Sequence, residues 1–361
     1  MKRLFDGVHA DAEAEERAWS VVGAAFAARE PRRRARRAVP VLVVAAVAAV
    51  VAAALSPPGR AVVDAMRRSI GIEGAQPALF KLPAPGRLLV SGPGGAWVVS
   101  ADGSTRHLGA YSQASWSPHG LYVIAATSNE LAAIEPATGR VHWQLARPGI
   151  TFPRWGGTRA DTRIAYLTTN DLHVVAGDGT GDRRLPPSAR VAPVWEPGTS
   201  QHVLAYVDVR GQVTILNPEH GIVSRRSRAY AGARALAWSP DGKTLALAAR
   251  GEIVLFTVAT GRTRAVRVTD VRGLAFAPDG RLALLRGDGV LLLSAGRLRT
   301  LVVAPSRLAG IAWSPNGKWL LSSLPQADQW VFVQTRGAHR VLAVSHIRRQ
   351  FGGEPSLDGW A

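Results

Sequence analysis

The pattern Trp-Ser-Pro-x-Gly recurs along this chain, and the repeat constrains the fold more than any other feature of the sequence. Good copies begin at Trp116, Trp238 and Trp313, and Phe276 begins a near copy that reads FAPDG. With weaker copies included, the aromatic positions are separated by 39, 40, 43, 38 and 37 residues: Trp116, Trp155, Trp195, Trp238, Phe276 and Trp313. A degenerate first copy places Phe80 36 residues before Trp116. A period near forty residues therefore predicts seven repeated units.

Each unit predicts four short strands joined by tight turns. In the fifth unit the expected strands are 233–238, 243–249, 252–258 and 262–268. Between the first two strands, Pro240 sets φ, Asp241 can bond its own backbone, and Gly242 accepts a positive φ. This is hairpin chemistry. The same reasoning gives a structural role to the equivalent turn residues Pro118, Gly120, Pro278, Asp279, Gly280, Pro315 and Gly317.

Four antiparallel strands per unit, repeated seven times, predict an all-β fold, a seven-bladed β-propeller over residues 76–361. One four-stranded sheet cannot bury both of its faces, but radially stacked sheets bury them against each other. The motif tryptophan is expected to fill the space between blades. The ending LDGWA resembles the strand that opens the other units, so we expect Trp360 to complete the first blade and close the ring.

The Trp-Ser-Pro-Asp-Gly pattern resembles the repeats of TolB-like propellers, which are relatives of the WD-repeat proteins. The resemblance covers about residues 76–361 and rests on three good copies and one near copy. The Gly-His…Trp-Asp signature of WD repeats is missing. The resemblance implies protein binding or scaffolding outside the cytosol, and it names no partner because propellers carry many functions.

An apolar segment precedes the repeats and is expected to anchor the chain. Residues 38–55 carry no charge, and as a helix they would span about 27 Å, enough to cross the hydrocarbon core. Five arginines lie directly before this segment: Arg32, Arg33, Arg34, Arg36 and Arg37. The positive-inside rule places them in the cytoplasm and the propeller outside a bacterial membrane. A cleaved signal peptide is the alternative, against which the long leader argues. Residues 56–75 are expected to form a juxtamembrane helix or a linker.

The cytoplasmic segment, residues 1–37, predicts a short amphipathic helix. Trp19, Val22 and Phe26 fall on one face of it, and a lone helix of this size is marginal in water. We therefore expect residues 9–30 to contact a cytosolic regulator or the inner leaflet. A short inner helix, one span and an outer domain resemble the layout of membrane-bound anti-sigma regulators, although the His-x-x-x-Cys-x-x-Cys zinc motif of many such proteins is absent.

The sequence shows little chemistry for catalysis. It has no cysteine, and none of its nine histidines shows metal-ligand spacing. Residues 133–143, AIEPATGRVHW, resemble the tryptophan-docking motif of quinoprotein propellers, but Glu135 replaces the aspartate and one copy alone is clear. We expect no metal, no cofactor and no enzymatic activity.

Charge supplies the remaining expectation about partners. The formal net charge is +18, which suits anionic partners. Arg225, Arg226 and Arg228 form the densest basic run of the outer domain; they are candidate partner contacts, and a solvated outer strand is the alternative. Aromatic residues hardly interleave this run, so nucleic acid is not expected. The predicted function is an envelope scaffold or sensor for a protein or ligand; the alternative is an enzyme or ligand carrier that uses the central channel.

Overall fold

The computed structural model describes residues 72–76, 81–169, 171–186, 188–304, 306–337 and 340–361. All of them lie in the second of two compact units, 50–361. Within these residues no helix is long and apolar enough to cross a membrane. The predicted span at 38–55 and the helix carrying Trp19, Val22 and Phe26 lie outside the described residues and stay predictions.

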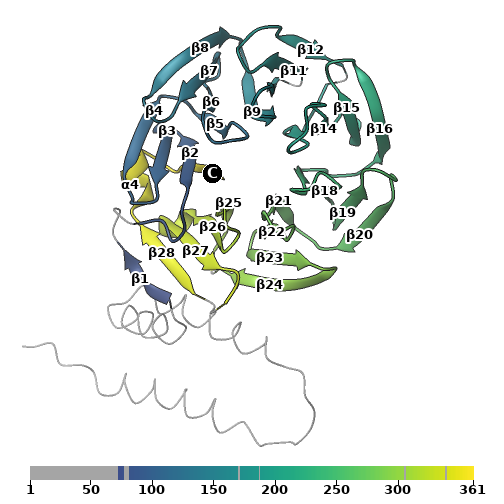
Figure 1. Ribbon diagram of the computed structural model, residues 1–361. Coiled ribbons are helices and arrows are strands. Elements are labelled where there is room, and N and C mark those ends of the chain that lie inside the picture. The colour runs from purple at the N-terminus through teal and green to yellow at the C-terminus, as the bar shows by residue number, and fades with distance from the viewer. Residues whose placement is uncertain (1–71, 77–80, 170, 187, 305, 338–339) are drawn as a thin grey trace, which may run out of the picture. The chain divides into compact units, whose positions relative to one another are not determined.

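Seven sheets, each built on four antiparallel strands, form a closed ring, so the predicted seven-bladed propeller is confirmed (Figure 1). Blade 1 contains β29 (Ser356–Trp360), β2 (Arg87–Gly92), β3 (Gly95–Ser100) and β4 (Thr105–Gly109). Blade 2 contains β5 (Gln113–Trp116), β6 (Val123–Ala126), β7 (Glu130–Glu135) and β8 (Arg140–Ala146). Blade 3 contains β9 (Ile150–Gly157), β10 (Thr162–Thr168), β11 (Asp171–Ala176) and β12 (Arg183–Leu185).

The remaining four blades repeat this order, from the innermost strand to the outermost. Blade 4 contains β13 (Val194–Trp195), β14 (Leu204–Val207), β15 (Gln212–Asn217) and β16 (Ile222–Ala229). Blade 5 contains β17 (Ala235–Trp238), β18 (Thr244–Ala249), β19 (Glu252–Thr257) and β20 (Thr263–Arg267). Blade 6 contains β21 (Val271–Phe276), β22 (Leu282–Arg286), β23 (Gly289–Ser294) and β24 (Arg297–Val303). Blade 7 contains β25 (Ala309–Trp313), β26 (Trp319–Leu324), β27 (Gln329–Gln334) and β28 (Val341–Ser345).

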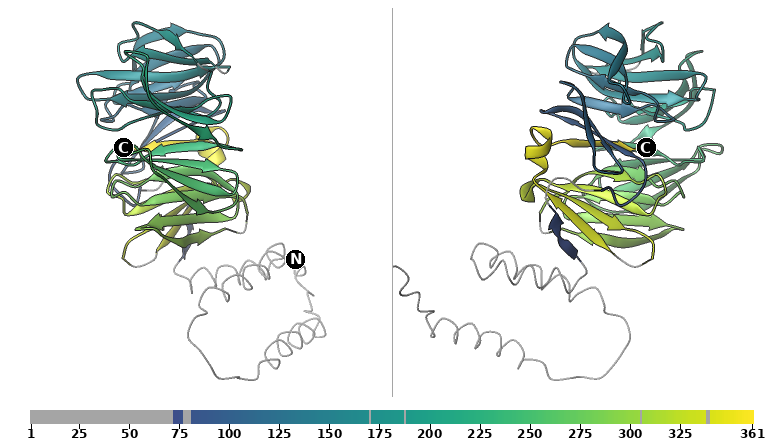
Figure 2. Two further views of the ribbon diagram at one scale, coloured as in Figure 1. Left: turned by 90° about the vertical axis from the view of Figure 1, so that its right-hand side faces the viewer. Right: turned by 60° about the vertical axis from the view of Figure 1, so that its left-hand side comes forward.

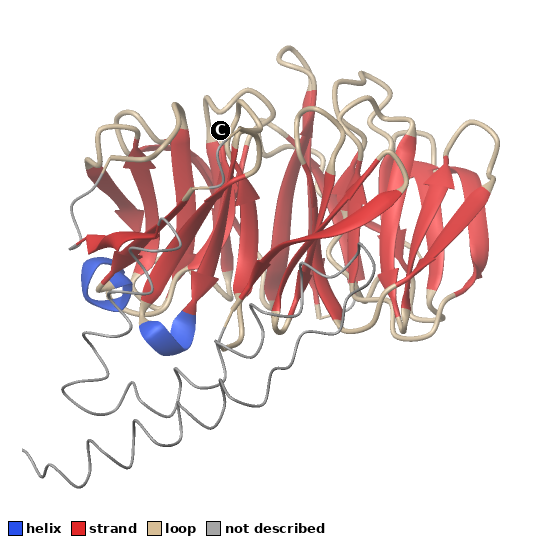
Figure 3. Cartoon of the chain, turned by 90° about the horizontal axis from the view of Figure 1, so that it is seen from below, coloured by secondary structure: helices blue, strands red, loops and turns tan. Residues whose placement is uncertain are grey.

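The C-terminal strand closes the ring, as the sequence predicted. Strand β29 pairs with β2, with Trp360 opposite Leu88, and its neighbours on either side are β25 and β5. In the other blades a continuous turn joins the innermost strand to the second strand. In blade 1 these two strands come from opposite ends of the propeller, so the chain end and residues 81–86 lie where the turn would be. Two backbone hydrogen bonds between Arg87 and Ala361 close it, at 2.5 and 2.9 Å. Edge-on views place the C-terminus on the opposite side of the ring from helix α4 (Ile347–Phe351), which precedes β29 (Figures 2 and 3).

One strand corrects the sequence analysis. Residues 72–75 were assigned to a juxtamembrane helix or linker, whereas β1 (Ile72–Gln76) pairs in parallel with β28 and makes blade 7 five-stranded. Its sequence, IEGAQ, has no alternating apolar pattern. The strand exists because the outer edge of β28 offers unpaired backbone groups, and a pattern of side chains does not report such an edge.

The core is divided among the seven junctions between blades. Seven buried apolar clusters each combine residues of two adjacent blades. Six of them contain a motif tryptophan that is at most 9% exposed: Trp116, Trp155, Trp195, Trp238, Trp313 and Trp360. In blade 1 the aromatic position of the motif is held by Trp360. The alignment of repeats had put Phe80 at this position, and Phe80 lies outside the described ranges. A motif tryptophan therefore lies in the core of six of the seven junctions.

The Ser-Pro-x-Gly turns hold the first two strands of a blade together. In blade 5 the Ser239 hydroxyl donates to Asp241 Oδ1 at 2.6 Å and accepts from the Thr244 backbone N–H at 2.9 Å. In blade 7 the Ser314 hydroxyl makes the same pair of contacts, with Asn316 and with the N–H of Trp319. Gly242 and Gly317 adopt φ of +68° and +63°, the left-handed region that favours glycine. Both polar positions of the motif are thus explained by the turn.

Candidate functional site

The tryptophan wedges make one repeated polar contact across the ring. The indole N–H of Trp195, Trp238 and Trp313 donates to the carbonyl of the residue before the preceding blade's aromatic, at 2.9, 3.2 and 3.0 Å. Trp116 makes the equivalent contact with Gly359 at 3.4 Å, across the closure of the ring. Each of these four indoles fills an apolar gap and also bonds the neighbouring blade, which is how a buried indole N–H is normally satisfied. The indole nitrogens of Trp155 and Trp360 are buried but have no hydrogen-bond partner among the described residues.

Several of these tryptophan rings are also covered by a side chain of the preceding blade. The covering residue stands at the start of that blade's second strand. Arg87 lies 5.0 Å from the ring of Trp116, and Arg281 lies 5.1 Å from the ring of Trp313. Both guanidinium groups also donate to a turn carbonyl of the next blade, Gly120 and Gly317 respectively. Tyr122 stacks in the same way on Trp155. A large side chain therefore seals these junctions from the side of the turns.

The junction between blades 5 and 6 lacks both the indole hydrogen bond and the large covering side chain. Its wedge is Phe276, whose side chain has no N–H and is only partly buried. The residue in the covering position is Thr244, which is shorter than arginine or tyrosine. A Cβ added to Gly120, Gly242 or Gly317 would meet the preceding blade, whereas one added to Gly280 would meet nothing within 4 Å. Phe276 and Thr244 together leave this junction open.

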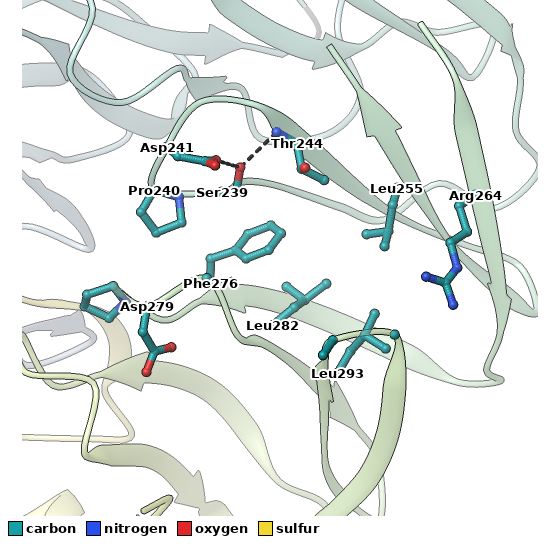
Figure 4. Close-up of a pocket in the computed structure, with 14 residues that line it drawn as sticks. Ser239, Pro240, Asp241, Thr244, Leu255, Arg264, Phe276, Asp279, Leu282 and Leu293 are labelled. Atoms are coloured by element: carbon teal, nitrogen blue, oxygen red, sulfur yellow. Dashed lines mark hydrogen bonds between the residues drawn. The ribbon is translucent and has the colours of Figure 1, made fainter. Parts of the chain in front are cut away.

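The result is a cleft of about 460 Å³, here called the blade 5/6 cleft (Figure 4). Its apolar lining comes from both blades: Leu255, Phe276, Leu282 and Leu293. The turns 239–241 and 278–280 border the inner end, and Arg264 lies at the outer end. The Phe276 ring lies between the two turns and the leucines (Figure 4). A cleft with apolar walls and a few polar groups at its rim is the usual form of a site for a ligand or a side chain.

The two acids at the inner end are already engaged within the protein. The hydrogen bond from Ser239 lowers the pKa of Asp241 below its ordinary value. Burial of Asp279 acts to raise its pKa, but hydrogen bonds from Arg281 outweigh this and keep the pKa low. Arg281 and Arg336 both pair with Asp279, at 2.8 and 2.6 Å. Arg264 has no ion-pair partner among the described residues, so the charge available to a ligand here is positive.

The three arginines predicted as partner contacts have different surroundings on β16. Arg225 donates to the backbone carbonyls of Val258 and Ala259 in blade 5, at 2.6 Å each. Arg228 lies over the ring of Tyr230, 4.4 Å from its centroid, and 3.8 Å from Glu252. Arg226 lines a groove between blades 3 and 4 with Arg184 and Arg210. Arg225 therefore links two blades, while Arg226 is the one of the three that lines this groove.

One other sequence observation finds a structural explanation. The tryptophan-docking match contains Trp143, whose indole donates to the Gly177 carbonyl of blade 3 at 2.9 Å. Thr138 donates to Glu135 within the same turn. In the part of the chain that the structure describes, no group of three His, Asp or Glu side chains is placed to hold a metal ion.

The innermost strands carry two partly buried charged residues, Asp358 and Arg154, that the repeat pattern did not single out. Asp358 on β29 has one oxygen, Oδ2, with no exposed area and no hydrogen-bond partner. Burial raises the pKa of Asp358 to about 7, against the opposing effects of Ser91 and the Arg154 charge. Burial also lowers the pKa of Arg154 on β9. The pattern of the motif gave no signal for this pair, because the two residues belong to repeats that are distant in sequence.

The blade 5/6 cleft was also missed, although the sequence held a signal for it. Phe276 is the one motif aromatic that is not tryptophan in the completed ring, and Thr244 replaces the larger covering side chains. The two positions lie in different repeats, and only the arrangement of neighbouring blades shows that they meet.

Comparisons with known proteins identify the fold. No protein-family model and no curated protein matches the sequence. The structure is similar to the β-propeller domain of Cps50 (Swd1) from Myceliophteria thermophila, with a TM-score of 0.52 and 12% identity over 64% of this chain and 86% of that one. It is also similar to a chain of the Mitotic Checkpoint Complex, with a TM-score of 0.55 and 16% identity over 72% and 93%. At such identities the likeness shows the β-propeller fold alone, and the TolB-like resemblance stays a prediction.

Proposed function

We propose that this chain is a protein-binding scaffold and that the blade 5/6 cleft receives an aromatic side chain of its partner. The open junction at Phe276 is the observation that carries this proposal. At neighbouring junctions the corresponding space is filled by an indole of the chain itself, so the cleft has the shape and chemistry of a site from which an indole is missing.

The lining supports an aromatic anchor. Leu282 and Leu293 are almost fully buried, and Leu255 and Phe276 are partly exposed to the cleft. Large aromatic side chains that enter desolvated pockets contribute most of the binding energy at many protein interfaces. Arg264 at the outer end adds a preference for a carboxylate near the aromatic residue, because its charge is unpaired among the described residues.

The experiment closes the cleft without disturbing the other junctions. Phe276→Trp with Thr244→Arg restores the wedge and the cover found between blades 6 and 7. Peptides are selected from a display library on the wild-type chain, and their affinity for both proteins is then measured. We expect selected peptides to carry Trp or Phe near Asp or Glu, and to bind the closed variant at least tenfold more weakly.

A matched variant tests whether the cleft itself matters. Trp313→Phe makes the opposite change of ring size at the next junction, where Arg281 still covers the gap, and should leave peptide affinity within about threefold. The closed variant, Phe276→Trp with Thr244→Arg, should also have a free energy of unfolding about 0.5–2 kcal/mol higher than the wild type. Peptides that bind the closed variant as tightly as the wild type would overturn the proposal.

The proposed setting of this scaffold is a bacterial membrane, with residues 38–55 as anchor and the propeller outside. The uncharged segment and the arginines before it support this orientation. Trp19, Val22 and Phe26 would then relay the bound state to a cytosolic regulator. A peptide of residues 1–37 that neither binds anionic vesicles nor recovers a specific cytosolic protein would reduce the proposal to an anchored scaffold.

A ligand carrier that uses the inner strands is the second candidate. The Asp358 and Arg154 pair favours it, because one carboxylate and one guanidinium could bind a small polar ligand. An enzyme at the same place has less support, since a single carboxylate and a single guanidinium offer a reaction little machinery. Loss of a small-molecule thermal shift in Asp358→Asn would favour the carrier.

A further inference from the structure

We propose that the outer edge of the ring binds a linear polymer of phosphate groups, with its strongest contact in a groove between blades 3 and 4. This inference is independent of the blade 5/6 cleft. It assigns a ligand class to the positive charge of the outer strands.

The charge is distributed around the outer strands in an unusual way. Strands β4, β8, β12, β16, β20 and β24 carry eleven arginines and no Asp or Glu. Every one of these side chains is exposed: Arg106, Arg140, Arg183, Arg184, Arg225, Arg226, Arg228, Arg264, Arg267, Arg297 and Arg299. The chain as a whole has 26 acidic residues, so their absence from these six strands concentrates positive potential there. We call this surface the arginine rim.

The groove between blades 3 and 4 gathers three guanidinium groups. Arg184 on β12, Arg226 on β16 and Arg210 in the turn between β14 and β15 line a space of about 590 Å³. Arg210 and Arg226 have no ion-pair partner among the described residues, and Arg184 pairs with Asp171 at 3.0 Å. The acid in the groove, Asp208, is buried and accepts backbone N–H bonds from Arg210 and Gln212 at 2.9 Å. The open charge of the groove is therefore positive.

Phosphate fits this arrangement better than carboxylate does. Guanidinium groups bind oxyanions through two parallel N–H donors, and three such groups from separate elements offer more donors than two carboxylate oxygens accept. Phosphate has more acceptor oxygens, arranged in three dimensions. A single phosphate would satisfy the groove, but the rim continues over six blades.

The curvature of the rim favours a flexible chain over a flat surface. The outer strands lie around the circumference of the ring (Figure 1), so a bilayer or a compact protein would meet only a few blades at once. A linear polymer can follow the curve. Bases are not required, because Tyr230, the aromatic residue beside the basic strand, is 6% exposed and lies under Arg228. Single-stranded nucleic acid is normally bound by stacking on exposed aromatics.

The test uses the full-length chain and medium-chain inorganic polyphosphate. The groove variant combines Arg184→Gln, Arg210→Gln and Arg226→Gln. The control variant combines Arg159→Gln, Arg307→Gln and Arg349→Gln, which removes the same charge from exposed sites off the rim. We expect the groove variant to bind polyphosphate at least tenfold more weakly and the control within about threefold. The slope of log affinity against log salt should flatten by about 2, because each lost phosphate contact contributes about 0.7.

Orthophosphate, anionic vesicles and single-stranded DNA distinguish the sources of phosphate. If orthophosphate competes as well as polyphosphate at equal total phosphate, a polymer is not required and the proposal is overturned. Vesicle binding that falls in the groove variant while polyphosphate binding does not would assign the rim to a lipid surface and overturn the proposal. If DNA binds more tightly per phosphate than polyphosphate does, the bases contribute to binding and the proposal of a ligand without bases is overturned. Equal losses in the groove and control variants would show that net charge alone is responsible, which contradicts the groove.

Discussion

Asp358 makes the closure of the ring sensitive to pH, and Asp358→Asn should remove this sensitivity. The residue lies on β29, the strand that completes blade 1, and burial raises its pKa from 3.8 to about 7. Below pH 3.8 both the folded and the unfolded chain keep the proton. Between pH 3.8 and 7 the unfolded chain releases its proton first, so the free energy of unfolding falls as the pH rises. Above pH 7 the difference is constant.

The size of this effect follows from the shift. About three pKa units correspond to about 4 kcal/mol, at 1.36 kcal/mol per unit. The residue as a whole keeps an intermediate exposure although Oδ2 is buried, so solvent screening reduces this value. We therefore expect a loss of about 2–4 kcal/mol between pH 4 and pH 8 that Asp358→Asn does not show.

The measurement is urea unfolding followed by tryptophan fluorescence at intervals from pH 4 to pH 8. Subtracting the variant's unfolding free energies from those of the wild type isolates Asp358 from the other titrating groups. Asp288→Asn, which removes an exposed carboxylate, is the control and should leave the wild-type pH trend in place. A wild-type minus Asp358→Asn difference that stays constant within about 1 kcal/mol, or that grows with pH, would refute the reasoning.

Other changes test the wedges, the closure and the topology. Trp238→Ala should cost about 3–5 kcal/mol in unfolding free energy, because it removes a wedge that is 8% exposed. Gly156→Ala places a Cβ 2.1 Å from Cγ of Trp195 and should lower the melting temperature, with a cost of about 1–3 kcal/mol from overpacking. Removing residues 356–361 exposes the edge of β2, so light scattering should show aggregation; a truncated chain that melts like the parent would contradict ring closure. A reporter fused after Ala361 should be active only if it works outside the cytoplasm, and activity of a cytosol-only reporter there would reverse the orientation.

Much of the fold could be predicted because its signals are local. In blade 5 the expected strands and the observed strands β17 to β20 agree within two residues at each end. Ser239, Asp241 and Gly242 act within one turn, so their spacing in the sequence is enough to predict the turn. In blades 3 and 4 the turns follow other sequences, yet Thr158 with Asp161, and Glu196 with Val203, close them through the same backbone bonds. Ring closure by Trp360 was predictable for the same reason, since LDGWA copies a local pattern.

The sequence by itself determined the number of blades, the wedge residues and the turns, because each depends on residues a few positions apart. Only the tertiary structure decided which features meet. Phe276 and Thr244 come from adjacent repeats and together open a cleft, while Arg184, Arg210 and Arg226 gather from two blades around one groove. Asp358 and Arg154 influence each other's pKa although about two hundred residues separate them, because both lie on innermost strands of the ring, β29 and β9. Radial packing places residues of different repeats side by side. A periodic sequence pattern shows what the repeats have in common, and it does not show which of their differing residues become neighbours.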